Sequence, residues 1–254
     1  MRLEELIRGI DGVRLVGGDA GTRICDLTED SRTAVPGSLF VARGGLKADG
    51  RAFVRDAIAL GAVAVLTDAE GAASVPSGAA TLVAPDVPLA AARLAERFYG
   101  EPTGRLVLIG VTGTNGKTTV AHLVHQILNH AGLRCGLVGT VEVDDGHSVA
   151  PAAMTTPPAI ELSRTFGCMV EAGCRAAVME VSSHALMQRR AAALRFDVGV
   201  FTNLSGDHLD YHGTMEAYAA AKGELFRMLP SDGLAVLNAE DPWSEEVGGE
   251  GRTR

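Results

Sequence analysis

The fold of this chain is decided by residues 110–119, which read Gly-Val-Thr-Gly-Thr-Asn-Gly-Lys-Thr-Thr. They follow the apolar run 106–111 and precede the helix-like segment 120–131, so a strand, a glycine-rich loop and a helix come in that order. In such a unit the backbone N–H groups of the loop and the N-terminus of the helix surround phosphate oxygens. Lys117 can then reach the β- and γ-phosphates, and the Thr118 hydroxyl can ligate Mg²⁺. The segment predicts a nucleoside triphosphate site formed by Gly113, Thr114, Asn115, Gly116, Lys117, Thr118 and Thr119.

One position departs from the general phosphate-loop pattern. Counting back from the Gly-Lys-Thr at 116–118, that pattern begins with a glycine at the position where this chain has Val111. Gly110 and Gly113 flank the position, so we interpret the loop as a variant of the pattern. The alternative is a glycine-rich turn that binds nothing, which would require Gly-Lys-Thr-Thr to occur at a strand–helix junction by chance.

The composition is that of a soluble globular protein. Of the 254 residues, 46% are hydrophobic and 21% charged, enough for one large or two ordinary domains. The formal net charge is −8 without any block of Lys and Arg, which argues against a nucleic-acid partner. No apolar run is long enough to span a bilayer and no leader pattern opens the chain, so we expect a cytoplasmic protein without membrane insertion. The four cysteines lack Cys-x-x-Cys spacing, which suits buried thiols better than disulfides or zinc ligands.

The first hundred residues read as a separate small α/β domain. Apolar periodicity predicts helices at 3–10, 50–60 and 89–99 and strands at 23–27, 38–42 and 62–67. The stretch 100–104, Gly-Glu-Pro-Thr-Gly, breaks the last of these helices and is predicted to be a linker. We therefore expect one domain at 1–100 and a second at 101–247.

Strands and helices alternate after the linker. Strands are predicted at 106–111, 135–143, 176–181, 198–202 and 234–237, and helices at 120–131, 158–172, 184–193 and 214–228. Short apolar strands joined by helical crossovers indicate a doubly wound, mostly parallel sheet, in which ligands bind beyond the carboxyl ends of the strands. The last predicted strand is expected to leave an apolar edge exposed, and residues 248–254 have no periodicity and are expected to fray.

Polar residues collect where the later strands end. Glu180 closes the apolar run 176–179 and is placed to complete an Mg²⁺ shell, the alternative being a solvated strand-end glutamate. Residues 202–213 contain two His and two Asp that could bind metal or substrate, although an isolated surface histidine is the more ordinary interpretation. Lys222 lies among alanines on a predicted helix, and its spacing alone favours a solvated lysine.

A series of motifs runs in an order known from one enzyme family. They are Asp30-Ser31-Arg32, 37–42, Asp49-Gly50, 110–119, Thr155-Thr156-Pro157, 179–186, 202–213 and 217–226. In these motifs the chain resembles the Mur ligases from about residue 24 to residue 242. Several motifs are shared with sister Mur ligases and folylpolyglutamate synthase. Glu-Val-Ser-Ser-His-Ala-Leu at 180–186 together with Asp-His-Leu-Asp-Tyr-His-Gly at 207–213 is most similar to the branch that adds the third residue of the peptidoglycan stem peptide.

The resemblance implies where the substrates bind. The uridine nucleotide is implied to bind in the first domain, at Asp30, Ser31 and Arg32. The muramoyl-dipeptide is implied to contact Thr155, Thr156, Ser182, Gln188 and Arg190. Hydroxyl groups and a guanidinium suit the pyrophosphate, sugar and carboxylate oxygens of UDP-N-acetylmuramoyl-L-alanyl-D-glutamate.

The resemblance also implies two Mg²⁺ ions. Thr118 and Glu180 would hold one ion, and His208 would hold the second together with Lys222. In the family this lysine is carbamylated, which converts a cation into a carboxylate-like metal ligand. The catalytic residues implied in this way are Lys117, Glu180, His208 and Lys222.

The implied reaction is ATP-dependent amide formation. The γ-carboxylate of the D-glutamyl residue attacks the γ-phosphate of ATP to give an acyl phosphate and ADP, and the amine of meso-diaminopimelate or L-lysine then displaces phosphate. Lys117 and the two ions neutralise charge between the reacting anions. Family members are much longer, so we expect a truncated, monomeric chain that lacks the domain selecting the amino acid. The alternatives are an inactive nucleotide- and UDP-sugar-binding module and a phosphate-loop kinase or GTPase, for which no base-selecting or lid motif is found.

Overall fold

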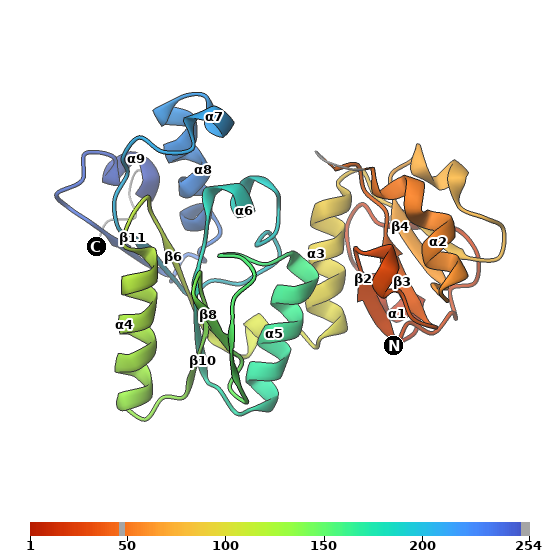
Figure 1. Ribbon diagram of the computed structural model, residues 1–254, viewed down its shortest axis with the longest axis horizontal. Helices are drawn as coiled ribbons and strands as arrows, with labels where there is room; N and C mark the ends of the chain where they lie inside the picture. The colour runs from red at the N-terminus through yellow and green to blue at the C-terminus, as the bar shows by residue number, and fades with distance from the viewer. Residues whose placement is uncertain (46–48, 250–254) are drawn as a thin grey trace. The chain divides into compact units, whose positions relative to one another are not determined.

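Two structural units make up the chain, Met1–Phe98 and Tyr99–Arg254. The computed structural model describes residues 1–45 and 49–249 (Figure 1). Each unit has its own sheet and its own buried apolar core. Within the described ranges, no helix is both long and apolar enough to cross a lipid bilayer.

The first unit is built on a five-stranded sheet. Its strands lie in the order β1 (Arg14–Gly17), β5 (Ala80–Val83), β4 (Ala64–Thr67), β3 (Ser38–Val41) and β2 (Asp26–Thr28). β1 pairs antiparallel with β5, and the other pairs are parallel. The helical segments are α1 (Leu3–Ile7), α2 (Val54–Ala59), α3 (Val87–Phe98) and the 3₁₀ turns η1 (Ser31–Thr33), η2 (Gly50–Phe53) and η3 (Gly71–Ser74). Every residue of β3, β4 and β5 is buried, as expected for parallel strands covered on both faces.

The sequence pattern does not predict β1 and β5. β1 alternates between exposed and half-buried residues, and β5 has four residues of which two are Ala and Thr. Such short runs carry little periodicity, so their strand structure comes from pairing with the rest of the sheet. The other elements expected in this unit are present, with ends that shift by a few residues.

The second unit is built on a seven-stranded sheet. Its strands lie in the order β12 (Leu234–Leu237), β11 (Val198–Phe201), β6 (Val107–Thr112), β10 (Ala176–Glu180), β7 (Cys135–Val138), β8 (Glu142–Asp144) and β9 (Val149–Pro151). The first five are parallel, and β8 and β9 add an antiparallel hairpin. The helical segments are η4 (Pro102–Gly104), α4 (Lys117–His130), α5 (Ala159–Glu171), α6 (Ser183–Met187), α7 (Leu209–His212), α8 (Met215–Arg227) and α9 (Ser244–Gly248).

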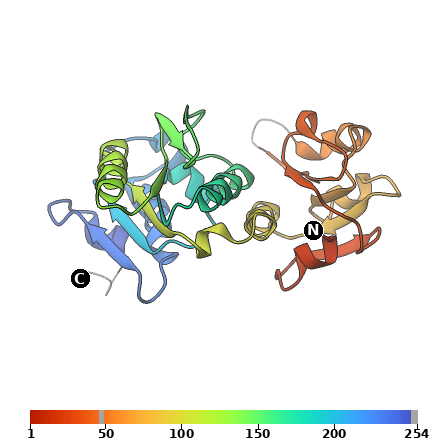
Figure 2. The same ribbon diagram turned by 90° about the horizontal axis from the view of Figure 1, so that it is seen from below.

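Helices cover both faces of this second sheet (Figure 1, Figure 2). Ile109 of β6 packs into one core with Ala121 of α4. Its neighbour Leu108 packs into the opposite core with Phe166 of α5 and Phe226 of α8. Adjacent side chains of a strand point to opposite faces, so β6 supplies both cores. The predicted doubly wound, mostly parallel sheet is confirmed.

Two predicted elements are shorter than expected. The run 135–143 is not one strand, because the chain reverses at Gly139 and Thr140 and returns antiparallel as β8. The helix predicted at 184–193 is α6, which ends at Met187. Arg189 follows in the left-handed region with φ of 60°, a conformation that cannot continue a right-handed helix.

The end of the second unit differs in part from expectation. Gly248 is not frayed, since it closes α9 and a β-carbon on it would overlap the Leu237 side chain. Residues 250–254 of the expected tail lie outside the described residues. The expected apolar edge is confirmed, because β12 is the outermost strand of the described sheet and Leu234 and Val236 on it are 51% and 43% exposed.

The strand order decides which polar residues meet. β7, β10, β6 and β11 are consecutive parallel neighbours, so their carboxyl ends lie side by side along one edge of the sheet. The chain leaves β6 into the glycine-rich loop, leaves β10 just after Glu180, and leaves β7 at Gly139. This edge is where ligands bind in open α/β sheets.

A substitution of Gly110, in the middle of β6, tests how tightly the core of the second unit is packed. A β-carbon on this residue would lie 2.8 Å from both Leu225 Cδ1 and Phe196 Cε1. We expect Gly110→Ala to lower the free energy of unfolding by about 1–3 kcal/mol, because a packed core must shift to admit the methyl group. Urea unfolding followed by circular dichroism measures the change. Gly104→Ala is the control, since no atom lies within 4 Å of the added carbon there, and an equal effect of both substitutions would contradict the packing argument.

Candidate functional site

A glycine-rich loop connects β6 to α4. Gly113 and Gly116 have φ angles of 147° and 81°, which residues with side chains rarely adopt. The segment after β11 holds this loop: the Thr114 N–H donates to the Asn203 carbonyl at 2.8 Å, and the Thr202 hydroxyl donates to a loop carbonyl at 2.7 Å. The loop therefore keeps its shape through contacts with a neighbouring strand end.

Lys117 is the first residue of α4 and folds back over the loop. Its ammonium group donates to the carbonyls of Gly113 and Thr114 at 3.0 and 2.9 Å. Burial lowers the pKa of Lys117, and the charge of Glu180 opposes that shift. The ammonium and the N-terminus of α4 give this loop the positive potential that phosphate groups require.

Lys222 on α8 is buried, so the solvated lysine favoured by its spacing is wrong. Its Nζ donates to the Gly113 carbonyl at 2.7 Å and lies 4.3 Å from the centre of the Tyr218 ring. Burial, and after it the charge of Lys117, lowers the pKa of Lys222 to about 7. Two ammonium groups therefore share one carbonyl, and one of them can lose its proton near neutral pH.

Glu180 is also buried, with 0% of its surface exposed, so the alternative of a solvated strand-end glutamate is wrong. Its Oε1 accepts from the Thr140 N–H at 2.8 Å, and its Oε2 accepts from the hydroxyls of Thr140 and Thr118, each at 3.0 Å. Thr119 follows Thr118 on α4 and is exposed. A carboxylate and a hydroxyl at this distance are the hard oxygen ligands that Mg²⁺ prefers, so the residues present fit such an ion.

His208 lies in the loop that leads into α7. It has a left-handed φ of 52°, and its side chain is about half exposed and 3.5 Å from Asp207. Its ring centre is 4.8 Å from that of His184 and 6.3 Å from that of Tyr218, the ring that Lys222 contacts. In the part of the chain that the structure describes, no three His, Cys, Asp or Glu side chains are grouped to hold a metal ion. The second metal site stays a prediction that depends on a carbamate at Lys222.

The residues predicted to bind the dipeptide gather at the carboxyl end of β10. They are Thr155, Thr156, Ser182, Gln188 and Arg190. The Thr156 hydroxyl donates to the last carbonyl of β10 at 2.9 Å and accepts from the Ser182 N–H at 3.1 Å. Arg190 donates to the Thr156 carbonyl at 2.9 Å and twice to the Gln188 side chain, at 2.7 and 3.1 Å. Thr156, Ser182, Gln188 and Arg190 therefore form one hydrogen-bonded group, whereas Thr155 is bonded to the Thr140 hydroxyl at 3.1 Å.

Asp30, Ser31 and Arg32 lie together in the first unit. The Asp30 carboxylate caps η1 by accepting from the Arg32 N–H at 3.0 Å, and it also accepts from the Arg32 guanidinium at 2.7 Å. Hydrogen bonds from Arg32 lower the pKa of Asp30. Ser31 is buried, whereas 86% of the Arg32 side chain is exposed.

Several polar residues of the site escape the sequence analysis. Thr140 lies inside the run 135–143, which reads as a single strand in the sequence. Because β7 ends at Val138, Thr140 in fact follows the carboxyl end of a strand, where ligands bind in sheets of this kind. Ser183 and His212 belong to quoted motifs without an assigned role, and the His212 Nε2 lies 2.9 Å from the Ser183 hydroxyl oxygen. This contact joins α6 to α7.

Protein-family models match both units of the chain. The model described as the Mur ligase middle domain matches residues 111–253, and the model of the Mur ligase family catalytic domain matches residues 24–99. The chain belongs to the Mur ligase family. The predicted resemblance is thereby confirmed, and the phosphate loop, Glu180 and Lys222 all lie in the region matched by the Mur ligase middle domain.

Individual Mur ligases are similar over most of the chain. UDP-N-acetylmuramoyl-L-alanyl-D-glutamate–2,6-diaminopimelate ligase of Pseudomonas aeruginosa is 51% identical over 230 residues, 89% of this chain and 47% of the relative. The enzyme of the same name from Ectopseudomonas mendocina is 49% identical over 235 residues, 92% of this chain and 48% of the relative. A solved structure of a ligase with this name has a TM-score of 0.80 at 30% identity and covers 97% of this chain and 49% of its own. The chain spans about half the length of the curated relatives it matches.

The buried amine of Lys222 predicts a specific pH dependence of stability. In the folded chain it loses its proton near pH 7, whereas in the unfolded chain it keeps the proton to about 10.5. The unfolded state binds more protons between these values, so the Lys222 contribution to stability rises with pH across that window. Between about pH 7 and about pH 10, we expect the unfolding free energy of the wild type to rise by about 2–4 kcal/mol more than that of Lys222→Met. Urea unfolding of both proteins in CO₂-free buffer measures it, and a constant difference would show that the amine stays protonated.

Proposed function

We propose that this chain is the nucleotide- and substrate-binding portion of an ATP-dependent ligase that adds 2,6-diaminopimelate to UDP-N-acetylmuramoyl-L-alanyl-D-glutamate in peptidoglycan synthesis. The observation that carries the proposal is the convergence of Lys117, Lys222 and the Glu180–Thr118 pair on one phosphate loop. The shared name of relatives at 49–51% identity supports the choice of amino acid. An inactive binding module is the weaker alternative, because it would not require a buried lysine with a pKa near 7.

The two units are proposed to divide the substrates. Residues 1–100 would hold the uridine nucleotide through Asp30, Ser31 and Arg32, where a buried hydroxyl and an exposed guanidinium suit a pyrophosphate. Residues 101–247 would hold ATP and the muramoyl-dipeptide. This division follows the family match, with one model on each unit.

ATP and Mg²⁺ are the proposed cofactors. Lys117 and the loop N–H groups would bind the β- and γ-phosphates. Thr118 and Glu180 would hold one Mg²⁺, and His208 would hold a second together with the carbamate of Lys222. Bound Mg²⁺ supplies the charge neutralisation that lets a carboxylate approach a phosphate.

The proposed reaction forms an amide in two displacements. A carboxylate oxygen of the D-glutamyl residue bonds to the γ-phosphorus as the bond to the leaving ADP oxygen breaks, and the amine nitrogen then bonds to the acyl carbon as phosphate leaves and the amine loses a proton. Arg190, Thr155 and Thr156 would orient the dipeptide beside the loop. Such positioning lowers the barrier because the reacting groups are already aligned.

The environment of Lys222 favours carbamylation. A pKa of about 7 leaves much of the amine neutral at physiological pH, and the neutral amine is the form that attacks CO₂. The nitrogen bonds to carbon, one N–H proton is released, and a carbamate anion results. This exchange removes the buried positive charge beside Lys117, so the fold that depresses the pKa also favours the modification.

Nucleotide binding tests the phosphate-loop assignment. We expect Lys117→Ala to weaken Mg²⁺·ATP binding by about 100-fold or more, because the loop loses a charge that meets two phosphate groups. Isothermal titration calorimetry of the purified chain measures the affinity. Arg227→Ala is the control, because Arg227 is an exposed cation on α8 that pairs with Glu224. An unchanged affinity of Lys117→Ala would overturn the assignment.

Carbamylation of Lys222 can be observed directly. In ¹³C-bicarbonate at about pH 8 we expect one carbamate carbon signal by NMR, absent in Lys222→Met and reduced below about pH 7, where the amine is protonated. In a full-length ligase carrying this segment, Lys222→Ala should abolish activity, and added short carboxylates should restore part of it. A bare amine at saturating bicarbonate would contradict the modification.

A further inference from the structure

We propose that Thr140, supported by Gly139, positions Glu180 for Mg²⁺. This inference rests on the proposed function, because it concerns the ion assigned to Thr118 and Glu180. The family resemblance assigns no role to Thr140. Its role follows from hydrogen bonds at the turn between β7 and β8.

Thr140 contacts both oxygens of the Glu180 carboxylate. Its N–H donates to Oε1 at 2.8 Å and its hydroxyl donates to Oε2 at 3.0 Å. Two donors from one residue fix the rotation of the carboxylate plane, which a single contact cannot do. Glu180 is fully buried, so these donors also satisfy a charge that water does not reach.

Gly139 provides the space for this arrangement. A β-carbon at residue 139 would lie 2.9 Å from Glu180 Oε1, which is closer than real β-carbon contacts allow. The Gly139 N–H donates to the Glu142 carbonyl at 3.0 Å and closes the turn that presents Thr140. The pair Gly139-Thr140 is therefore shaped around the carboxylate.

The Thr140 hydroxyl also links Glu180 to the dipeptide-binding residues. It lies 3.1 Å from the Thr155 hydroxyl oxygen. The Thr140 hydroxyl is the donor in this contact as well as in the contact with Oε2, so its single proton serves either the Glu180 carboxylate or the Thr155 oxygen. A continuous chain of contacts then runs from Thr155 through Thr140 and Glu180 to Thr118 of the phosphate loop.

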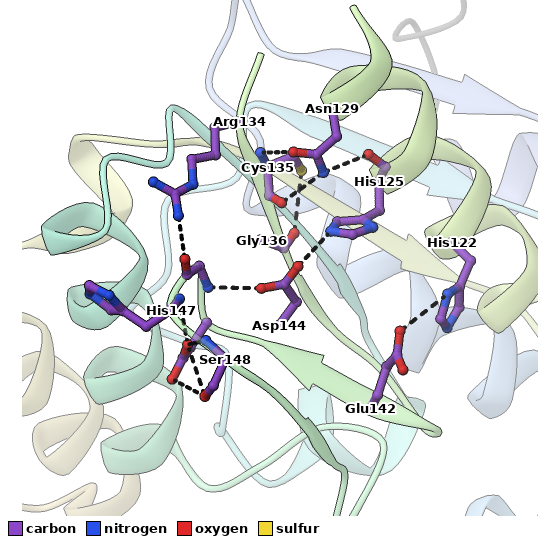
Figure 3. A network of polar contacts seen from close by, with 12 residues as sticks. His122, His125, Asn129, Arg134, Cys135, Gly136, Glu142, Asp144, His147 and Ser148 are labelled. Atoms are coloured by element: carbon purple, nitrogen blue, oxygen red, sulfur yellow. Dashed lines mark hydrogen bonds and ion pairs between the residues drawn. The ribbon is translucent and has the colours of Figure 1, made fainter. Parts of the chain in front are cut away.

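The β7–β8 hairpin, whose turn carries Thr140, is anchored to α4 (Figure 3). On the β8 side, the His125 Nε2 lies 3.2 Å from Asp144, and the His122 Nδ1 lies 3.8 Å from Glu142. On the β7 side, the Asn129 side chain bonds both the N–H and the carbonyl of Cys135, at 3.1 and 3.0 Å. α4 also carries Thr118 in its first turn. The two hydroxyls that bind Glu180 are thus held on one framework.

Substitutions at residue 140 separate the hydroxyl from the shape of the side chain. Thr140→Val keeps the branched side chain and the N–H but removes the hydroxyl, whereas Thr140→Ser keeps the hydroxyl. The probe is a fluorescent methylanthraniloyl ATP bound by the purified chain, with the Mg²⁺ midpoint of binding measured by titration and Mg²⁺-free binding measured in EDTA. We expect Thr140→Val to raise the Mg²⁺ midpoint by about tenfold or more and Thr140→Ser by less than about threefold, with Mg²⁺-free binding unchanged in both.

Gly139→Ala is the second variant, in case Thr140→Val does not fold. It retains every donor but crowds Oε1, so we expect it to raise the Mg²⁺ midpoint in the same direction. A midpoint within twofold of the wild type in the folded variants, or a Thr140→Ser midpoint equal to that of Thr140→Val, would overturn the positioning role. Failure of the wild type to bind the nucleotide at all would instead overturn the proposed function and this inference with it.

Discussion

Two ammonium groups meet at one carbonyl oxygen in the second unit. Lys117 and Lys222 both donate to the Gly113 oxygen, and both have lowered pKa values because burial disfavours their charged forms. A buried pair of like charges is costly unless an anion or proton loss relieves it. The phosphate loop is thus built to be completed by anions. Phosphate groups can supply that charge at Lys117, and a carbamate can supply it at Lys222.

The fold could be predicted from sequence because each central strand is a short apolar run with a helix between it and the next. That pattern fixes parallel strands and places Glu180 at the ligand-binding edge without any distant contact. The edges of the sheets could not be predicted in the same way. β8 and β9 have three residues each, and the reversal at Gly139 lies inside a run that is apolar on both sides. Pairing with a neighbouring strand, which local periodicity does not encode, decides such elements.

The candidate site was predicted where its chemistry is local and missed where it depends on tertiary contacts. Lys117 and Thr118 are recognised by spacing alone. The burial of Lys222 comes from packing α8 against a loop 109 residues earlier in the chain, so its helix gives no sign of it. Thr140 reaches Glu180 across 40 residues, because β7 and β10 are neighbours in the sheet. Strand order therefore determines which polar residues meet, and periodicity does not reveal that order.

The charge on Lys222 links the two proposed metal positions to the phosphate loop. With a protonated amine, the groups around Gly113 carry two positive charges near the carboxylates of Glu180 and Asp207, and a divalent cation brought near the two ammonium groups meets repulsion from them. A carbamate reverses the charge of residue 222 from +1 to −1, which is a change of two units within hydrogen-bonding reach of the loop. In a buried setting, where the effective dielectric constant is well below that of water, the electrostatic energy of such a change is large compared with that of an ordinary surface ion pair. The same lysine would thus determine whether this edge of the sheet repels or attracts a cation, beside the Glu180 carboxylate that Thr140 hydrogen-bonds.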